Sequence, residues 1–109
     1  MSAPDLSVTE AHRLWTEGRL AIIDVREQGE HDTSRVAGIP LIPVSGLLSQ
    51  IDDIPTDLPL AVLCRSGRRS AQVADYLSAA GEHGEVANIE GGIIAWAAEG
   101  LPYEGEPPT

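Results

Sequence analysis

Three continuous apolar segments constrain the fold of this chain more than any other feature. They cover residues 20–25, 60–63 and 86–89, and helical patterns separate them along the chain. A strand without polar alternation has to be buried on both of its faces. Helices that alternate with such strands predict an α/β fold, an open parallel sheet with helices on both faces.

Helix signals flank these segments. Ser7 and Glu10 have the spacing of a capping box, so we expect Ser7 to begin the first helix, and Gly18 to end it. A second helix follows residue 70 and closes at Gly81, and a last one covers residues 93–99. These boundaries place each expected helix next to an expected strand.

The segment between the first two long strands is harder to assign. Residues 41–43 predict a short strand, and residues 45–51 predict a short helix. We expect this helix to turn three apolar side chains inward, those of Leu47, Leu48 and Ile51.

The chain's only cysteine, Cys64, directly follows the expected strand at 60–63. A loop with Gly67 comes next and leads into a helix whose first turn we expect Ser66 or Ser70 to cap. Loop N–H groups and a helix N-terminus form a concave anion site, and a thiol at its rim favours the thiolate. The alternative is a buried cysteine that ends a strand before a solvated arginine turn.

Three of the seven basic residues lie in this loop, and all seven are arginine: the three are Arg65, Arg68 and Arg69. Guanidinium groups supply positive charge and planar donors for an oxyanion. We therefore expect a nucleophilic cysteine that acts on an anionic substrate, and we expect the arginines to lower its pKa. The chain holds no lysine, which excludes Schiff-base chemistry through a lysine.

Asp24 and Arg26 stand where the first long strand ends. Open parallel sheets bind ligands at the carboxyl ends of their strands. The two residues therefore belong either to a ligand site or to a structural ion pair that fixes the polar crossover at 26–38. A solvated surface is the simplest interpretation of the other polar residues in that crossover.

Charge and composition limit the remaining possibilities. The 109 residues suit one domain, and the net charge of −10 argues against nucleic acid and anionic membranes as partners. A single cysteine excludes an intramolecular disulfide and fits a reducing compartment, and the first ten residues lack the pattern of a signal peptide. We expect a cytoplasmic location, and a flexible tail at 103–109 because that segment is rich in Pro, Gly and Glu.

In four segments the sequence resembles the single-domain rhodaneses, the thiosulfate sulfurtransferase-like family. These segments are residues 22–27, 30–43, 64–70 and 88–93 with Trp96, and they occur in the family's order. The second segment departs from the family pattern at Ser34, Arg35, Ala37 and Ile39, which bears on the conformation of the crossover.

The resemblance implies a rhodanese-like domain with a core at about 6–102 and a parallel sheet of about five strands. It implies that Cys64 is the nucleophile and that the loop from Arg65 through Ser66, Gly67 and Arg68 to Arg69 binds the substrate. The expected reaction moves a sulfane sulfur from thiosulfate or a persulfide to an external thiol, through a persulfide on Cys64. The acceptor is a small thiol, cyanide in the assay, or a cysteine of another protein.

Three other functions stay open at this stage. Phosphatases and arsenate reductases of related fold carry a loop one residue longer, which a larger oxyanion requires. A non-catalytic binding module and a sulfur-relay protein are the other two. We expect no cofactor and no metal, because His12, His31 and His83 show no ligand spacing.

Overall fold

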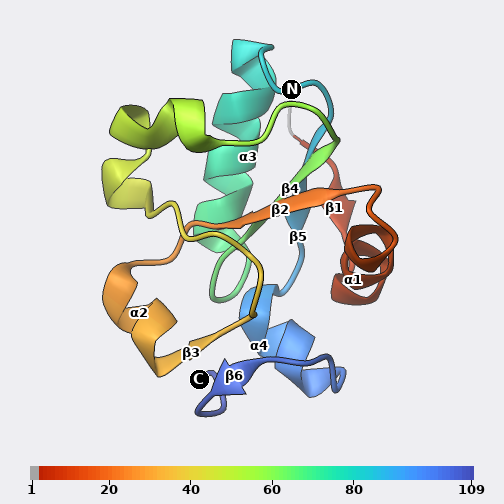
Figure 1. The fold of residues 1–109 in the computed structure, drawn as a ribbon, viewed down its shortest axis with the longest axis vertical. Coiled ribbons are helices and arrows are strands. Elements are labelled where there is room, and N and C mark those ends of the chain that lie inside the picture. The colour runs from red at the N-terminus through yellow and green to blue at the C-terminus, as the bar shows by residue number, and fades with distance from the viewer. Residues whose placement is uncertain (1–2) are drawn as a thin grey trace.

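The computed structural model describes residues 3–109 (Figure 1). Its elements in chain order are β1 (Asp5–Leu6), α1 (Val8–Thr16), β2 (Ala21–Asp24), α2 (Gln28–Thr33), β3 (Ser34–Arg35), 3-10 helices at Val44–Gly46 and Leu48–Asp53, β4 (Leu60–Leu63), α3 (Arg68–Ala80), β5 (Val86–Ile89), α4 (Gly92–Ala98) and β6 (Glu104–Gly105). The three expected long strands and the three main helices are confirmed.

The main sheet has four parallel strands in the order β1-β5-β4-β2. The sequence did not predict β1, which is only two residues long. The strand expected at 41–43 contributes one parallel bridge, between Leu41 and Asp24. Pro40 directly precedes Leu41, and proline has no N–H with which to extend the ladder in that direction.

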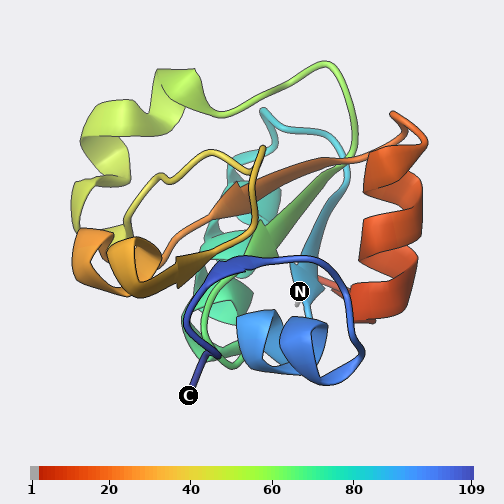
Figure 2. The ribbon, with the colours of Figure 1, turned by 60° about the horizontal axis from the view of Figure 1, so that its bottom comes forward.

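Each face of the sheet packs on its own core, because strand side chains point to opposite faces in turn. In β4, Leu60 and Val62 face the same core as Cys64, and helix α3 covers that face. Ala61 and Leu63 face the other core, which α1 and α4 cover (Figure 2). The side chain of Cys64 therefore points to the α3 side of the sheet.

The helix ends follow the sequence signals in most places. The Ser7 hydroxyl accepts a hydrogen bond from the Glu10 N–H at 3.1 Å and caps α1. The Glu10 carboxylate binds the Arg13 guanidinium. Gly81 caps α3 in the left-handed conformation, with φ of 75°. Local capping chemistry thus determines where these helices begin and end.

The short helix expected at 45–51 is wrong in its type and in one of its buried residues. The segment forms two 3-10 helices with a kink at Gln50, whose φ is −116°. Leu47 is buried, whereas Leu48 is 71% exposed. Successive residues of a 3-10 helix lie about 120° apart, so these two leucines cannot share one face.

The tail expected to be flexible has a defined course beside β3 (Figure 2). Strand β6 pairs antiparallel with β3, where Arg35 opposes Glu104, and the Glu106 N–H donates to the Thr33 carbonyl at 2.9 Å. Gly105 has a φ of 92°, and a Cβ there would collide with the Thr33 backbone. A glycine thus lets the tail lie against the crossover.

Within residues 3–109 no helix is long and apolar enough to span a bilayer. His83, in the turn before β5, is 4% exposed, and among the described residues neither of its ring nitrogens has a hydrogen-bond partner.

Candidate active site

Cys64 directly follows β4, at the carboxyl end of the parallel sheet, and is 1% exposed. The N-terminus of α4 holds its backbone: the Ile93 N–H donates to the Cys64 carbonyl at 2.8 Å, and the Ile94 N–H donates to the Arg65 carbonyl at 3.2 Å. A Cβ on Gly92 would collide with both of those residues. The Gly91-Gly92 turn therefore lets α4 approach the loop closely and fixes its first two residues.

The loop then turns back over the thiol. The Cys64 Sγ accepts hydrogen bonds from the Gly67 N–H at 3.1 Å, the Ser70 N–H at 3.4 Å and the Ser70 hydroxyl at 3.1 Å. Gly67 has a φ of 96° and is the N-cap of α3. The expectation that Ser66 or Ser70 caps this helix is wrong, because the Ser70 side chain binds the sulfur instead. The predicted nest of N–H groups is present around Sγ.

These contacts set the acidity of the thiol. Burial raises the pKa of the Cys64 thiol, and hydrogen bonds from the Ser70 hydroxyl and from the N–H groups of Ser70, Gly67 and Ser66 lower it. The hydrogen bonds together outweigh burial, so the pKa lies below its ordinary value. The expected direction is therefore confirmed, while the largest favourable contributions come from the loop and not from the arginines.

The three loop arginines have different surroundings. Arg69 lies at the first turn of α3 and binds Glu30 of α2 with two hydrogen bonds of 2.7 Å. The Arg65 Nε donates to the Thr109 carbonyl oxygen at 2.6 Å. Arg68 is exposed. Sequence reasoning treated Glu30 as a solvated residue, and no local signal connects it to an arginine 39 positions later.

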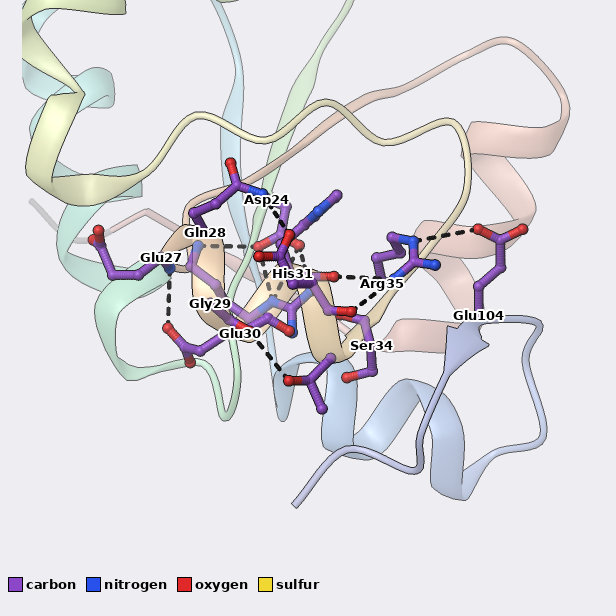
Figure 3. Close-up of polar contacts among 12 residues, drawn as sticks. Asp24, Glu27, Gln28, Gly29, Glu30, His31, Ser34, Arg35 and Glu104 are labelled. Carbon is purple, nitrogen blue, oxygen red and sulfur yellow. Dashed lines mark hydrogen bonds and ion pairs between the residues drawn. The ribbon is translucent and has the colours of Figure 1, made fainter.

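Asp24 and Arg26 form a buried ion pair, which decides between the two interpretations of these residues. The Arg26 guanidinium donates to both Asp24 oxygens, and its Nη2 donates to the Ser34 carbonyl as well, at 2.8 Å. Figure 3 shows Asp24 and Ser34 beside α2, and the Arg35–Glu104 ion pair that connects the crossover to β6. The pair is structural, since its donors and acceptors hold the crossover.

A cleft of about 280 Å³ lies beside the loop. Arg26, Ser34 and Arg65 contribute to its wall, and so does the tail from Pro107 to Thr109. An apolar cleft of about 430 Å³ lies at the opposite end of the sheet, where β4 and β5 begin. The smaller cleft lies at the carboxyl ends of the strands, where open parallel sheets bind ligands, but Arg65 is the only residue of the loop that lines it and Cys64 does not.

Sequence reasoning missed two residues that are connected to the thiol through Ser70. Asn88 lies in β5 and is buried, and its Oδ1 lies 2.6 Å from the Ser70 Oγ, so it is a second acceptor for the same hydroxyl hydrogen. Its amide nitrogen donates to Asp5 of β1 at 3.0 Å. The available signal was the polar amide inside an otherwise apolar strand, because such a group needs buried hydrogen-bond partners.

Comparison with known proteins agrees with this geometry. The family described as "Rhodanese-like domain" matches residues 7–99. The chain belongs to the rhodanese family. Within residues 3–109 no three His, Cys, Asp or Glu side chains come together in a way that could hold a metal ion.

The rhodanese relatives include proteins of different size. A sulfurtransferase of Allochromatium vinosum is 35% identical over 92 residues, which cover 84% of this chain and 85% of that protein. The probable adenylyltransferase/sulfurtransferase MoeZ of Mycobacterium tuberculosis is 35% identical over 86 residues, which cover 77% of this chain and 22% of MoeZ. The chain thus matches most of the Allochromatium vinosum sulfurtransferase and only a small part of MoeZ.

A solved rhodanese structure has the same fold. The crystal structure of a rhodanese-related protein from Thermoplasma volcanium superimposes with a TM-score of 0.83 at 29% identity. The match covers 94% of this chain and 99% of that one. The parallel four-stranded sheet with its helices is therefore the rhodanese-like α/β fold, as the sequence predicted.

Proposed function

We propose that this protein is a sulfurtransferase that moves a sulfane sulfur from thiosulfate or a persulfide to an external thiol. The observation that carries the proposal is the set of three hydrogen bonds that Cys64 Sγ accepts from Gly67 and Ser70. Donors directed at a sulfur stabilise its negative charge and make it a nucleophile at neutral pH. The N–H groups among these donors also suit the terminal sulfur of a persulfide.

The reaction runs as two displacements. The Cys64 thiolate attacks the outer sulfur of thiosulfate, a new S–S bond forms, and sulfite leaves with the electron pair of the old bond. An acceptor thiolate then attacks the outer sulfur of the Cys64 persulfide, and the Cys64 thiolate leaves. Cyanide replaces the acceptor in the assay and yields thiocyanate. This covalent route predicts ping-pong kinetics.

The loop residues take separate roles in this scheme. The backbone from Arg65 through Ser66, Gly67 and Arg68 to Arg69 encloses the transferred sulfur. Arg65 and Arg68 attract and orient the anionic donor, whereas Arg69 braces the loop through Glu30. Because Cys64 is 1% exposed, a donor whose sulfur is a single terminal atom suits the site best.

The acceptor has to come from outside, because the chain contains no second cysteine that could resolve the persulfide. A small thiol and a cysteine of another protein meet this need with the same chemistry. A purely binding role is less favoured, because it does not explain why three hydrogen-bond donors surround the Cys64 sulfur.

Mass spectrometry of the protein after incubation with thiosulfate tests the proposal. We expect a gain of one sulfur atom that reductant removes, and no gain in Cys64→Ser. We also expect Cys64→Ser to abolish thiosulfate:cyanide sulfur transfer while its circular dichroism stays that of the wild type. Ser49→Ala, on the exposed 3-10 helix, is a matched control and should retain full transfer. Transfer by Cys64→Ser near the wild-type rate would refute the proposal.

A further inference from the structure

The Ser70 hydroxyl lies between two groups that both accept hydrogen bonds. Its Oγ is 3.1 Å from the Cys64 Sγ and 2.6 Å from the Asn88 Oδ1. A hydroxyl carries one hydrogen and can donate it to only one acceptor at a time. Ser70 therefore cannot serve the sulfur and the amide oxygen together.

Asp5 decides which atom Asn88 presents to Ser70. The Asn88 Nδ2 donates to the Asp5 Oδ1 at 3.0 Å, and an ionised carboxylate is an acceptor only. If the amide turned over, its oxygen would face the carboxylate with no hydrogen between them. Asp5 thus keeps the Asn88 oxygen directed at Ser70, where it competes for the hydroxyl hydrogen.

The competition has a different outcome in each state of the sulfur. With a neutral thiol, the Sγ–H donates to the Ser70 oxygen, and the Ser70 O–H donates to Asn88. Every hydrogen-bonding group from Asp5 to Cys64 then has a partner. When the thiol loses its proton to solvent, Ser70 has to turn its O–H toward the thiolate. The Asn88 oxygen then loses its donor at a buried position, which is unfavourable.

We propose that Asn88, oriented by Asp5, is a positioning residue that restrains the Ser70 hydroxyl from serving the Cys64 thiolate. The inference deepens the proposed function and rests on it, because it concerns the reactivity of the same cysteine. A persulfide leaves the Cys64 Sγ uncharged, so Ser70 returns to Asn88 when sulfur is bound. The series of hydrogen bonds from Asp5 through Asn88 and Ser70 to Cys64 therefore favours the thiol and the persulfide over the free thiolate.

Charged groups on the elements around Cys64 already have partners in most cases, so they change little when Ser70 turns. They are Arg69 of α3 with Glu30 of α2, Arg26 with Asp24 after β2, Arg65 of the loop with the Thr109 carbonyl, Glu27 with Ser45, Asp75 of α3 with the Ala3 N–H, and the exposed Arg68 and Glu90. Among them, Arg69 interacts electrostatically with Cys64. None of the variants below changes Arg69, so this interaction is the same in all of them.

The test is the pH midpoint for alkylation of Cys64 by iodoacetamide, which is neutral and requires no sulfur transfer. Asn88→Leu removes the competing oxygen with little change in size, and Asp5→Asn frees the amide to turn its nitrogen toward Ser70. We expect each variant to lower the midpoint by about 1 to 2 pH units, the size of one hydrogen bond to a charged group. Asp75→Asn removes a carboxylate on the neighbouring helix face as a charge control, and should leave the midpoint within about 0.2 unit.

A double mutant distinguishes positioning from a structural role. Ser70→Ala should raise the midpoint, and adding Asn88→Leu to Ser70→Ala should cause no further shift, because Asn88 acts through the missing hydroxyl. A raised or unchanged midpoint in Asn88→Leu, or an equal shift with and without Ser70, overturns the proposal. If Asn88→Leu fails to fold by circular dichroism, Asp5→Asn decides, since Asp5 is exposed at the sheet edge. Alkylation is measured without any donor, so a failed persulfide experiment would refute the function and leave this result intact.

Discussion

Arg69 and Glu30 form a two-pronged ion pair that joins the first turn of α3 to α2. The Arg69 Nη1 donates to the Glu30 Oε2 and its Nη2 donates to the Glu30 Oε1, each at 2.7 Å. The hydrogen bonds from Arg69 lower the pKa of the Glu30 carboxyl from 4.5 to about 2. Arg69, which the sequence analysis placed in the substrate loop, thus holds that loop against α2.

The ion pair predicts a specific pH dependence of stability. Because the pKa of Glu30 is lower in the folded protein than the ordinary 4.5, its contribution is present above pH 4.5 and is lost as the pH falls toward 2. Glu30→Gln should lower the free energy of unfolding by about 1 kcal/mol near neutral pH, a value reduced for the partial exposure of both side chains.

Urea denaturation of the wild type and Glu30→Gln at about pH 7, 5 and 3 measures this difference. The gap between the two proteins should narrow as the pH falls. Glu10→Gln is the control, since Glu10 forms a more exposed pair with Arg13 and should change stability less. A gap that stays constant down to about pH 3 would contradict the assignment.

Arg65 and Arg68 should affect the donor more than the thiol. The hydrogen bonds that lower the pKa of Cys64 come from the Ser70 hydroxyl and from loop N–H groups. We therefore expect Arg65→Ala and Arg68→Ala to leave the iodoacetamide alkylation midpoint within about 0.3 unit. Each should slow persulfide formation from thiosulfate by roughly three- to tenfold and weaken its dependence on salt.

Stopped-flow measurement of persulfide formation at several salt concentrations provides the second readout. Ser70→Ala serves as the comparison, since it should raise the alkylation midpoint. If both arginine variants raise the midpoint as much as Ser70→Ala does, the arginine field and not the loop activates the thiol.

The loop geometry predicts selectivity against phosphate esters. Arginine follows Cys64 after four residues, one fewer than in the phosphatases of related fold, and Arg69 binds Glu30. A tetrahedral oxyanion needs a wider ring of donors than a single sulfur does. We expect negligible hydrolysis of p-nitrophenyl phosphate, with Cys64→Ser as the background. Hydrolysis that depends on Cys64 and exceeds sulfur transfer would reverse the assignment.

Gly92 should be essential to the site for steric reasons. It has a φ of 60°, and a Cβ there would collide with the Cys64 and Arg65 carbonyl groups. Gly92→Ala should lower the free energy of unfolding by about 3 kcal/mol or more and reduce sulfur transfer, because α4 can no longer hold the loop. Gly100→Ala is the matched control: its φ is 75° but its surroundings are open.

Thermal unfolding and the cyanide assay on both glycine variants check this prediction. Gly100→Ala should lower stability by only about 1 kcal/mol and leave transfer close to that of the wild type. Equal effects of the two substitutions would show that backbone strain alone, and not the contact with the loop, explains the loss.

The sequence by itself determined the long strands, the main helices and the position of the thiol. These follow from local chemistry: apolar runs at 20–25, 60–63 and 86–89 can only be buried strands, and Ser7 and Gly81 satisfy groups at nearby helix ends. Cys64 comes directly after one such strand, so a parallel sheet puts it at the edge where ligands bind.

The tertiary structure decided which residues meet around that thiol. Asp5 reaches Asn88 only because β1 lies beside β5, and 83 residues separate them along the chain. The Glu30–Arg69 pair and the course of the tail along β3 likewise depend on contacts between distant segments. Local patterns describe how a segment folds, whereas the order of strands in a sheet results from the packing of the whole chain. For that reason the sequence predicted Cys64 as the nucleophile, and the sheet order was needed to find the residues that we propose to act on it.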